Sequence, residues 1–559
     1  MANTCDVIGD HDSSWHVFTI SPTLPIQVPE QPSKNTKKKK SKGGGTPLIG
    51  IGASEEDDFS TWYQQVLLKS EMIDYYDISG CYILRPGSWE IWEILQVWFN
   101  KQLRKMKIRN CSFPLFVNEK VLSKEENHVE GFSAEVAWVT QSGKTKLDSK
   151  IAIRPTSETI IYPYLANWIR SHRDLPVKLN QYNSVVRWEF RNPQPFLRSR
   201  EFYWQEGHTA HLTKAGADQE VLEILDIYTT IYQDFLAVPV IPGRKSENEA
   251  FAGADYTTSV EAFIPSTGRA IQGATSHALG QNFSKIFNIS VENPQKDGSP
   301  NSSRVFVWQN SWAYSTRVIG VMVMVHGDDK GLVLPPRVAP TQVIIIPVGI
   351  TASTSDDEKQ SLYNNVFQLE KALLDAEIRV ETDIATEYSP GWKFNHYELK
   401  GIPLRLEFGP KELKDGFLST SRRDTLEKGR ISLTDATSEV LALLETIQSD
   451  MYARALEKFR NNVKVITDWE RFTPAINNKH VCLIPFCLRP DCEDQIKKMS
   501  ERSSALEGEQ QDARAPSMGA KSLCIPFKQV AELEGTNTPC LAKGCENMAA
   551  KWTLFGRSY

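Results

Sequence analysis

The stretch that decides the fold runs from Arg187 to His208 and reads RWEFRNPQPFLRSREFYWQEGH. Residues 183–190 and 200–206 alternate apolar and polar side chains, which predicts two strands. Residues 192–197 between them hold two prolines, so this segment is expected to be a loop. The stretch therefore predicts an antiparallel hairpin, and we expect the rest of the chain to be arranged around it.

Charged residues are concentrated at the strand ends and in the loop of this hairpin. They are Arg187, Glu189, Arg191, Arg198 and Arg200. Because unpaired charge is costly away from water, so many charges favour an anion bound between them. Guanidinium groups bind phosphate and carboxylate through paired hydrogen bonds, and a carboxylate such as Glu189 can accept from the amino group of adenine. The alternative is a surface ladder of cross-strand ion pairs, and the residues alone leave both open.

Four further segments carry a family resemblance. They read AIRPTSE at 152–158, QGATSH at 272–277, GLVLPP at 331–336 and GRSY at 556–559. The hairpin resembles motif 2 of the class II aminoacyl-tRNA synthetases, and with these segments the chain resembles the eukaryotic and archaeal type of prolyl-tRNA synthetase over residues 58–559. The resemblance implies a multidomain protein of the α/β and α+β classes. It would have an antiparallel-sheet catalytic core flanked by helices, an α/β anticodon-binding domain and a C-terminal α/β zinc-binding domain.

The chain has 559 residues, enough for three or four domains of about 100–200 residues each. Residues 1–50 are rich in lysine and poor in apolar residues, so we expect them to be disordered. The lysine run at 37–40 is a solvated linker, a patch for RNA phosphates or a localisation signal. We expect a catalytic domain at 51–336, an anticodon-binding domain at 341–460 and a zinc-binding domain at 461–559.

Composition limits the partners of the chain. The net charge of -5 gives no general sign of nucleic-acid binding, so an RNA site must be a local patch. No run approaches about 18 uncharged apolar residues, and the first ten residues lack the features of a secretory signal. We therefore expect a cytoplasmic protein that does not bind membranes.

Residues 88–103 place apolar side chains on one face of a predicted helix, and residues 111–118 predict a strand. Pro114 cannot donate a backbone hydrogen bond, so this strand is expected at a sheet edge or bulge. The helix and strand resemble motif 1 of the family, which forms the homodimer interface. The alternative is that Pro114 merely ends a strand.

The resemblance assigns a proline-binding pocket to residues from several segments. They are Phe132, Thr156, Glu158, Arg187, Trp204, Glu206, His208 and His277. Thr156 and Glu158 would hold the α-amino group, because a carboxylate pairs with an imino cation. On the residues alone, the same segment can cap a helix that runs from Glu158 to Trp168. Trp204 or a lone histidine would also more often belong to the core.

The resemblance also assigns an ATP site. Its residues are Arg187, Glu189, Arg198, Gln272, Thr275 and Arg317. Arg187 is the residue expected to be catalytic, bridging the α-phosphate and the proline carboxylate, and Mg²⁺ is expected to assist the arginines. Arg317 opens a strongly apolar helix or strand, where a planar guanidinium could stack on adenine and reach the terminal phosphate.

Residues 341–440 alternate strands and helices, which predicts an α/β unit with a mostly parallel sheet. The resemblance assigns this unit to anticodon binding, with Glu407, Lys411 and Arg422 facing the anticodon. Each of these three residues is equally consistent with a solvated strand end.

Six of the nine cysteines lie in the C-terminal part of the chain, which favours a local metal site over a secreted disulfide framework. Two close pairs suit a tetrahedral Zn²⁺ site that is structural. The predicted ligands are Cys487, Cys492, Cys540 and Cys545. Cys482 or Cys524 could substitute for one of them, and four free thiols are the alternative.

The resemblance implies an ATP-dependent ligase that activates L-proline as prolyl-adenylate and transfers the prolyl group to tRNA(Pro). In-line attack of a carboxylate on the α-phosphate needs positioning and charge stabilisation, which fits a chain that shows arginines and no nucleophile triad. One alternative is a non-catalytic binding protein with the synthetase fold, which would have lost the motif arginines. Another is a synthetase with side activity toward cysteine or alanine, because one missing contact discriminates by only about 1–3 kcal/mol.

Overall fold

The computed structural model describes residues 50–122, 136–188, 192–294, 304–351, 353–501, 519–531, 533 and 537–559. All of them belong to one compact unit, residues 48–559. Apart from Gly50, the segment predicted to be disordered lies outside the described residues.

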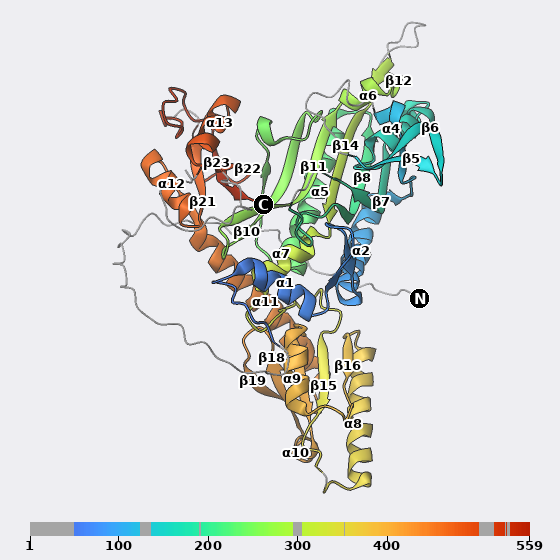
Figure 1. Cartoon of the computed structure of the whole chain (residues 1–559), viewed down its shortest axis with the longest axis vertical. Helices are drawn as coiled ribbons and strands as arrows, with labels where there is room; N and C mark the ends of the chain where they lie inside the picture. Colours follow the sequence, from blue (N-terminus) through green and yellow to red (C-terminus); the bar gives the residue numbers. More distant parts are fainter. Residues whose placement is uncertain are drawn as a thin grey trace, which may run out of the picture. The chain divides into compact units, whose positions relative to one another are not determined.

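A large sheet, antiparallel over most of its width, dominates the region predicted to be the catalytic domain (Figure 1). Its strands in this region run in the order β9, β10, β11, β14, β8, β7, β3. Their bounds are β9 Ile241–Arg244, β10 Tyr256–Ile264, β11 Arg269–Gly280, β14 Trp308–Ser315, β8 Glu201–His211, β7 Val177–Val186 and β3 Arg109–Asn110. The predicted hairpin is β7 and β8, which pair antiparallel from Val186 opposite Glu201 to Val177 opposite Ala210. Because β7 ends at Val186, Arg187 follows directly after the strand.

Helices α1 (Phe59–Lys69), α2 (Pro86–Lys105), α5 (Lys214–Thr230) and α7 (Arg317–His326) form one hydrophobic core with the sheet. The buried apolar residues of α2 are Ile91, Trp92, Leu95, Phe99 and Leu103. Successive members are one to four positions apart in the sequence, which places them on one face of the helix, as the sequence predicts. Helix α5 changes its hydrogen bonding after Thr230 and is continued by a π-helical turn, η2 (Ile231–Phe235).

Smaller elements complete this region. They are β1 Ile73–Tyr75, β2 Tyr82–Leu84, β4 Phe116–Asn118, β5 Trp138–Ser142, β6 Thr145–Ile153, α4 Glu158–Trp168, η1 His172–Asp174, η3 Glu247–Glu249, α6 Asn282–Ile286, β12 Ser290–Glu292 and β13 Arg304–Phe306. The helix predicted over residues 158–168 matches α4.

The strand predicted over residues 111–118 is right only for residues 116–118, which form β4 at the edge of a three-stranded sheet. Residues 111–115 belong to no strand, and Pro114 separates β3 from β4. β3 pairs in parallel with β7 at the edge of the large sheet, whereas β4 pairs with β6 in a separate three-stranded sheet. Proline cannot donate to a ladder, so the chain leaves one sheet and enters another around this residue.

The next unit has a five-stranded sheet in the order β16, β15, β17, β18, β19. Its elements are β15 Val343–Pro347, α8 Asp356–Asp375, β16 Val380–Thr382, α9 Pro390–Leu399, β17 Leu404–Phe408, α10 Pro410–Asp415, β18 Phe417–Arg422, β19 Lys428–Ser432 and α11 Ala436–Asn462. β15 is parallel to β16 and β17, but β18 and β19 are antiparallel, so the expectation of a mostly parallel sheet is only half right. The short α10 connection cannot make the crossover of a dozen or more residues that a parallel pair needs.

The C-terminal elements are β20 Val463–Val465, α12 Trp469–Asn477, β21 Val481–Phe486, α13 Pro490–Met499, β22 Lys521–Pro526 and β23 Lys551–Ser558. Their strands extend the large sheet, because β22 pairs with β9 and the end of β23 pairs in parallel with β11. The C-terminal strands therefore lie directly beside β9 and β11 of the predicted catalytic domain.

None of the described helices combines the length and the apolar character that crossing a membrane requires.

Candidate active site

Most of the predicted site residues surround one cavity of about 300 Å³ on the large sheet. Those that line it are Thr156, Glu158, Arg187, Trp204, Glu206, His208, Gln272, Thr275, His277 and Arg317. In β8, Trp204, Glu206 and His208 share one face because successive strand residues point to opposite sides. The other face of β8 is so close to the core that a Cβ on Gly207 would lie 2.1 Å from the Trp312 ring.

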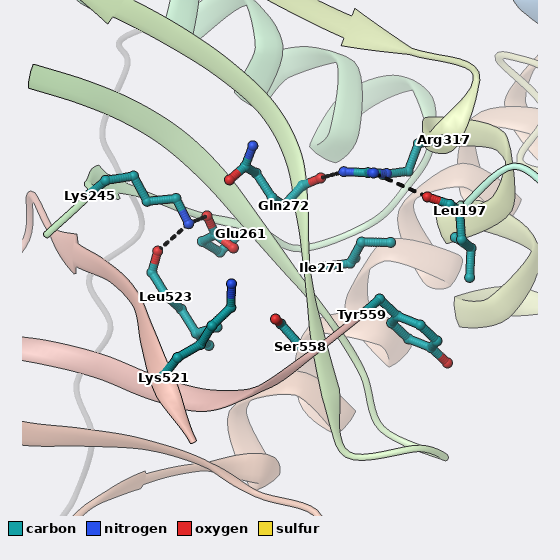
Figure 2. Close-up of a pocket in the computed structure, with 10 residues that line it drawn as sticks. All are labelled: Leu197, Lys245, Glu261, Ile271, Gln272, Arg317, Lys521, Leu523, Ser558 and Tyr559. Atoms are coloured by element: carbon teal, nitrogen blue, oxygen red, sulfur yellow. Dashed lines mark hydrogen bonds and ion pairs between the residues drawn. The ribbon is translucent and has the colours of Figure 1, made fainter. Parts of the chain in front are cut away.

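Arg317 begins α7 at one end of the cavity, and its guanidinium is held by backbone carbonyls (Figure 2). Nη1 donates to the carbonyl oxygen of Gln272 and Nη2 to that of Leu197, both at 3.1 Å. Burial lowers the pKa of Arg317, and the positive charges of Arg187 and Arg198 lower it further. No carboxylate among the described residues forms an ion pair with Arg317, so the site concentrates positive charge that an anion would neutralise.

Arg187 lies between two halves of the cavity. Its Nε donates to the Pro155 carbonyl oxygen at 3.1 Å. Its guanidinium carbon lies 5.5 Å from the ring centroid of Phe202 and 5.3 Å from that of Trp204, within the range of cation–π contact. The planar group is thus oriented by a backbone acceptor and two rings.

Arg198, a predicted ATP residue, does not line the cavity. It is half-buried in the loop after β7, where burial and the nearby Arg269 lower its pKa. Phe132, expected in the proline pocket, and Glu189, expected at the adenine, both lie outside the described residues.

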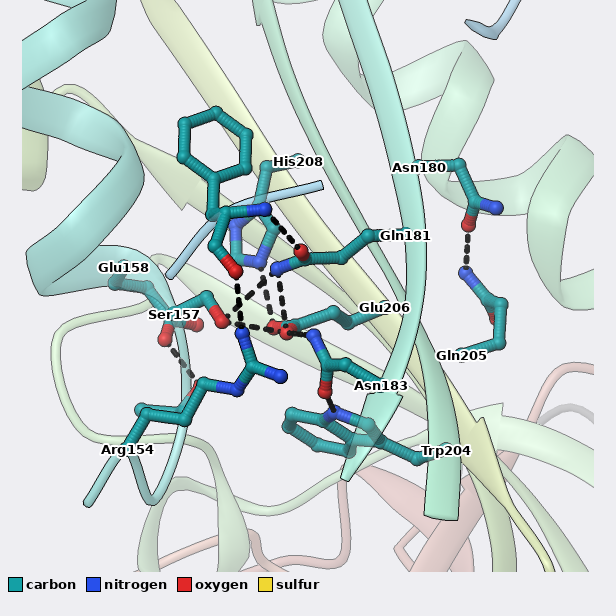
Figure 3. A network of polar contacts seen from close by, with 12 residues as sticks. Arg154, Ser157, Glu158, Asn180, Gln181, Asn183, Trp204, Gln205, Glu206 and His208 are labelled. Atoms are coloured by element: carbon teal, nitrogen blue, oxygen red, sulfur yellow. Dashed lines mark hydrogen bonds and ion pairs between the residues drawn. The ribbon is translucent and has the colours of Figure 1, made fainter. Parts of the chain in front are cut away.

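The Glu206 carboxylate organises the opposite half of the cavity (Figure 3). Its Oε1 accepts from Ser157 Oγ at 2.5 Å, from Asn183 Nδ2 at 2.7 Å and from Gln181 Nε2 at 2.9 Å. Its Oε2 lies 2.9 Å from Nε2 of His208. Ser157, Gln181 and Asn183 were not predicted as site residues. The feature that could have identified them is a polar side chain within or directly beside a strand that packs against a core.

Glu206 and His208 form a buried ion pair, with 2% and 1% of their surfaces exposed. Burial opposes charge on His208, but the hydrogen bond to Glu206 and the negative charge of Glu158 outweigh burial and raise its pKa. Burial alone would raise the pKa of Glu206, yet His208 and Ser157 together lower it. The Tyr162 hydroxyl lies 3.1 Å from Nδ1, the other ring nitrogen of His208, so the imidazole ring is fixed in the cavity.

Thr156 and Glu158 meet at the start of α4, where Thr156 donates to the Glu158 carboxylate. Ser157 occupies the N-cap position, but its side chain makes no capping hydrogen bond in the described structure and instead donates to Glu206. The hydroxyls of this segment therefore serve the cavity, which argues against the helix-capping interpretation. Trp204 also lines the cavity, and its Nε1 donates to Asn183 Oδ1 at 2.7 Å.

His277 enters the cavity from β11 and is held by two residues that the sequence analysis did not select. The Thr257 hydroxyl lies 2.9 Å from its Nδ1, and the Phe251 ring centroid lies 4.7 Å from its own. Burial and the positive charges of His208 and Arg187 lower the pKa of His277 to about 3. A neutral imidazole at this position can donate or accept one hydrogen bond without adding charge.

The four predicted zinc ligands converge. The Sγ atoms of Cys487, Cys492, Cys540 and Cys545 all lie within 4.8 Å of one another. Cys545 Sγ is 3.3 Å from Cys492 Sγ and 3.9 Å from Cys487 Sγ. Tetrahedral zinc with Zn–S bonds of about 2.3 Å requires sulfur separations of about 3.8 Å, so the cluster fits the ion. The suggested substitutes do not join the four sulfur atoms. Cys482, on β21, shares a hydrophobic cluster with Cys492 and Cys540 but is not one of the four, and Cys524, on β22, lies in another hydrophobic cluster.

The three predicted anticodon residues lie on the five-stranded unit but differ in surroundings. Lys411 is exposed on α10. Glu407, on β17, accepts from the Arg405 guanidinium at 3.1 Å. Arg422 is buried, and the hydrogen bonds that it donates to the carboxylates of Asp424 and Asp450 at 2.7 to 3.0 Å raise its pKa. Of the three, only Lys411 presents its charge to solvent.

Comparison with known proteins matches three parts of the chain. Residues 138–326 match the tRNA synthetase class II core domain (G, H, P, S and T). Residues 342–443 match the anticodon binding domain, and residues 469–559 match the C-terminal region of prolyl-tRNA synthetase.

Relatives align over nearly the whole chain. The cytoplasmic proline--tRNA ligase of Arabidopsis thaliana is 51% identical over 527 residues, 94% of this chain and 94% of that protein. The proline--tRNA ligase of Encephalitozoon cuniculi is 47% identical over 516 residues, 91% of this chain and 99% of that protein. That of the archaeon Cenarchaeum symbiosum is 40% identical over 512 residues, 91% of this chain and all of that protein. The chain therefore belongs to the prolyl-tRNA synthetase family of class II aminoacyl-tRNA synthetases.

Proposed function

We propose that this chain is a proline--tRNA ligase whose two half-reactions take place in the cavity around Arg187. The first joins L-proline to ATP as prolyl-adenylate and releases pyrophosphate, and the second transfers the prolyl group to the terminal ribose of tRNA(Pro). The observation that carries the proposal is that one cavity joins an arginine-rich half to a half with the carboxylates Glu158 and Glu206. The phosphates of ATP would match the arginine-rich half, and the imino cation of proline would match the half with the carboxylates.

The chemistry needs no side-chain nucleophile. An oxygen of the proline carboxylate attacks the α-phosphorus of ATP, a new P–O bond forms, and the bond to the bridging oxygen breaks with its electron pair left on pyrophosphate. Arg187, oriented by Pro155 and two rings, would hold the carboxylate against the α-phosphate. Preorganised donors of this kind stabilise charge that develops in the transition state, typically by about 10²–10³ in rate each.

At the proline end, Glu158 with Thr156 would accept hydrogen bonds from the imino cation, while the Trp204 face covers the ring. Glu206 has four donors on its two oxygens, so we assign it to positioning His208. His277 would meet the substrate as a neutral ring. Gln272, Thr275 and Arg317 would contact the nucleotide.

The two expected metal ions differ in how this chain would hold them. Glu261 beside Gln272 is already ion-paired with Lys245 at 2.8 Å, so Mg²⁺ would be held mainly by the phosphate oxygens of ATP, whose charge it would neutralise. The four cysteines would hold Zn²⁺ without an open position, so that its contribution is to folding.

The remaining proposals concern partners. We assign the unit at 341–460 to the anticodon of tRNA(Pro), with Lys411 as its best-placed candidate. A homodimer would cover exposed aromatic side chains near the predicted motif 1, where Trp168 is 49% exposed and Tyr164 is 53% exposed. The name of the Arabidopsis relative supports a cytoplasmic location.

Proline-dependent exchange of pyrophosphate into ATP tests the function directly. The wild-type protein should catalyse exchange with proline, more weakly with cysteine or alanine, and not without an amino acid. Arg187→Ala should lower exchange at least about 100-fold, and Arg187→Lys should recover little because lysine lacks the planar fork. Arg173→Ala, at an exposed arginine of the same region, is the matched control. A protein without proline-dependent exchange would instead support the non-catalytic alternative.

A further inference from the structure

The turn at residues 194–198, between β7 and β8, is closed by its own backbone. The N–H of Gln194 donates to the carbonyl oxygen of Arg198 at 2.9 Å, and the N–H of Arg198 donates to the carbonyl oxygen of Gln194 at 3.0 Å. Phe196 between them is buried and has a φ of 63°, in the left-handed region that a residue with a side chain rarely adopts. Such a conformation persists where the surrounding structure fixes it. The position of this turn therefore depends on the elements packed around it.

Helix α1 supplies one fixed point for the turn. The hydroxyl of the buried Tyr63 donates to the carbonyl oxygen of Pro195 at 3.0 Å. Helix α1 precedes residues 138–326, so this hydrogen bond reaches the turn from outside the part of the chain that matches the class II core. A buried acceptor that loses its donor is costly, because water does not replace the partner. The hydrogen bond therefore holds the turn against α1.

Helix α7 holds the same turn from another side. A Cβ on Gly320 would lie 2.8 Å from the Tyr63 hydroxyl oxygen and 2.8 Å from the Cβ of Phe196, so the three segments meet without free space. Arg317, three residues before Gly320, donates from Nη2 to the carbonyl oxygen of Leu197 at 3.1 Å (Figure 2). Tyr63 and Arg317 therefore bind carbonyl groups of the turn that are only two residues apart.

The orientation of the Arg317 guanidinium depends on this turn. Its hydrogen bonds among the described residues go to the carbonyl oxygens of Leu197 and Gln272, both at 3.1 Å. Its Nε is buried without a hydrogen-bond partner in the part of the chain that the structure describes, and the residue lines the active-site cavity. A shift of the turn would remove one of the two carbonyl anchors. The guanidinium would then lose the fixed geometry that a reacting phosphate requires.

We propose that Tyr63 is a positioning residue for the nucleotide. Its hydroxyl fixes the turn at 194–198, and the turn fixes Arg317 through the Leu197 carbonyl. Tyr63 does not line the active-site cavity, so it acts through Arg317 and does not touch ATP. The inference deepens the proposed function and rests on it, because it takes Arg317 as a ligand of ATP. Helix α1 then contributes to nucleotide affinity from outside the site.

Packing of the hydrophobic core is the competing explanation, because the rings of Tyr63 and Tyr228 belong to one core cluster. Tyr228 therefore offers a matched control. It is fully buried, and its hydroxyl is hydrogen-bonded to the side-chain amide of Gln205 at 2.9 Å. Gln205 lies on β8 but does not line the active-site cavity. Phenylalanine at either position removes one buried hydroxyl and keeps the ring, whereas the bond to the turn is lost in Tyr63→Phe alone.

The test compares Tyr63→Phe and Tyr228→Phe in proline-dependent pyrophosphate exchange. In Tyr63→Phe the KM for ATP should rise about 3- to 10-fold, the scale of losing one hydrogen bond, while the KM for proline stays within about threefold of wild type. In Tyr228→Phe both constants should stay within about threefold, although the two variants should unfold at similarly lowered temperatures. Thermal unfolding with ATP needs no catalysis, and a fixed ATP concentration should stabilise Tyr63→Phe less than Tyr228→Phe.

A KM for ATP within about threefold of wild type in Tyr63→Phe overturns the proposal, and so does an equal rise in Tyr228→Phe or in the KM for proline. Should exchange in Tyr63→Phe be too slow to give a KM, the rise in unfolding temperature with ATP decides. A rise equal to that of Tyr228→Phe contradicts the proposal, and a smaller rise supports it. Absence of proline-dependent exchange in the wild-type protein would instead refute the proposed function, which keeps the two failures distinguishable.

Discussion

Replacing Arg317 by methionine should separate stability from activity. Methionine keeps much of the length of the side chain and removes the charge at the start of α7. The arginine donates to two carbonyl oxygens, and its Nε has no hydrogen-bond partner among the described residues. Arg187 and Arg198 lie near it and lower its pKa in the same direction as burial does. A cation in such surroundings is a cost to the free protein that a bound phosphate would offset.

The magnitude follows from opposing contributions. Losing two hydrogen bonds from a charged donor removes about 1.5–3 kcal/mol each. Removing a buried charge without a counter-ion recovers several kcal/mol of desolvation free energy. The two nearly cancel, so the free energy of unfolding of the ligand-free protein should change by no more than about 1 kcal/mol.

Nucleotide binding should change far more. At an ATP concentration of 100 times its Kd, the wild-type protein gains about 2.7 kcal/mol of stability from the ligand. If the substitution weakens binding 100-fold, the gain at the same concentration falls to about 0.4 kcal/mol. Proline-dependent exchange should fall at least about 100-fold, because a preorganised donor is lost.

Thermal unfolding with and without ATP, together with pyrophosphate exchange, measures both effects, and Arg173→Met serves as the exposed control. Two results would contradict the reasoning. A loss of more than about 3 kcal/mol in the ligand-free variant would make Arg317 a structural residue, and exchange within tenfold of wild type would remove it from the ATP site.

Three further predictions concern the cysteine cluster, the predicted anticodon-binding unit and the proposed dimer interface. Cys487→Ser should lower bound zinc, measured by metal analysis, and unfold the C-terminal unit at a lower temperature, because closed thiolate sites contribute folding free energy; full zinc occupancy in the variant would remove Cys487 from the ligand set. Lys411→Met should weaken charging of tRNA(Pro) by about 10-fold and leave proline-dependent exchange unchanged, with Lys359→Met as control; equal losses in both assays would contradict an anticodon role. Trp168→Glu should weaken dimerisation by about 30-fold in light scattering, the scale of one interface tryptophan, whereas Phe367→Glu should not; a wild-type protein that is an active monomer would refute the interface.

Local structure was predictable where one strong signal acted alone. Helix α4 has the predicted bounds, and the hairpin of β7 and β8 follows from alternation and two prolines. The strand through Pro114 failed because alternation says nothing about which sheet a residue joins. The sheet of β15 to β19 failed in its second half because strand direction depends on the length of the connection, and α10 is too short for a crossover.

The residues that surround the cavity were predictable as a set, but the hydrogen bonds between them were not. The family resemblance selected Glu206 and His208, yet only the structure shows three neutral donors on one oxygen of Glu206. Gln181 and Asn183 come from β7, and their role depends on the register that places them beside β8. Periodicity defines the face that a residue occupies, whereas its partners are set by pairing between distant segments.

The C-terminal unit is joined to the sheet that carries the active-site cavity. Arg557 and Ser558 of β23 pair with Arg269 and Ala270 of β11, two residues before Gln272. The cysteine cluster proposed to hold zinc precedes β23 in the chain, and Cys492 and Cys540 share a hydrophobic cluster with Phe555 of that strand. Loss of zinc should therefore reach the ATP side of the cavity through the sheet before it reaches Glu158 and the proline side. Partial zinc removal should raise the KM for ATP and pyrophosphate while the KM for proline stays constant, and an earlier effect on proline would show that the coupling follows another route.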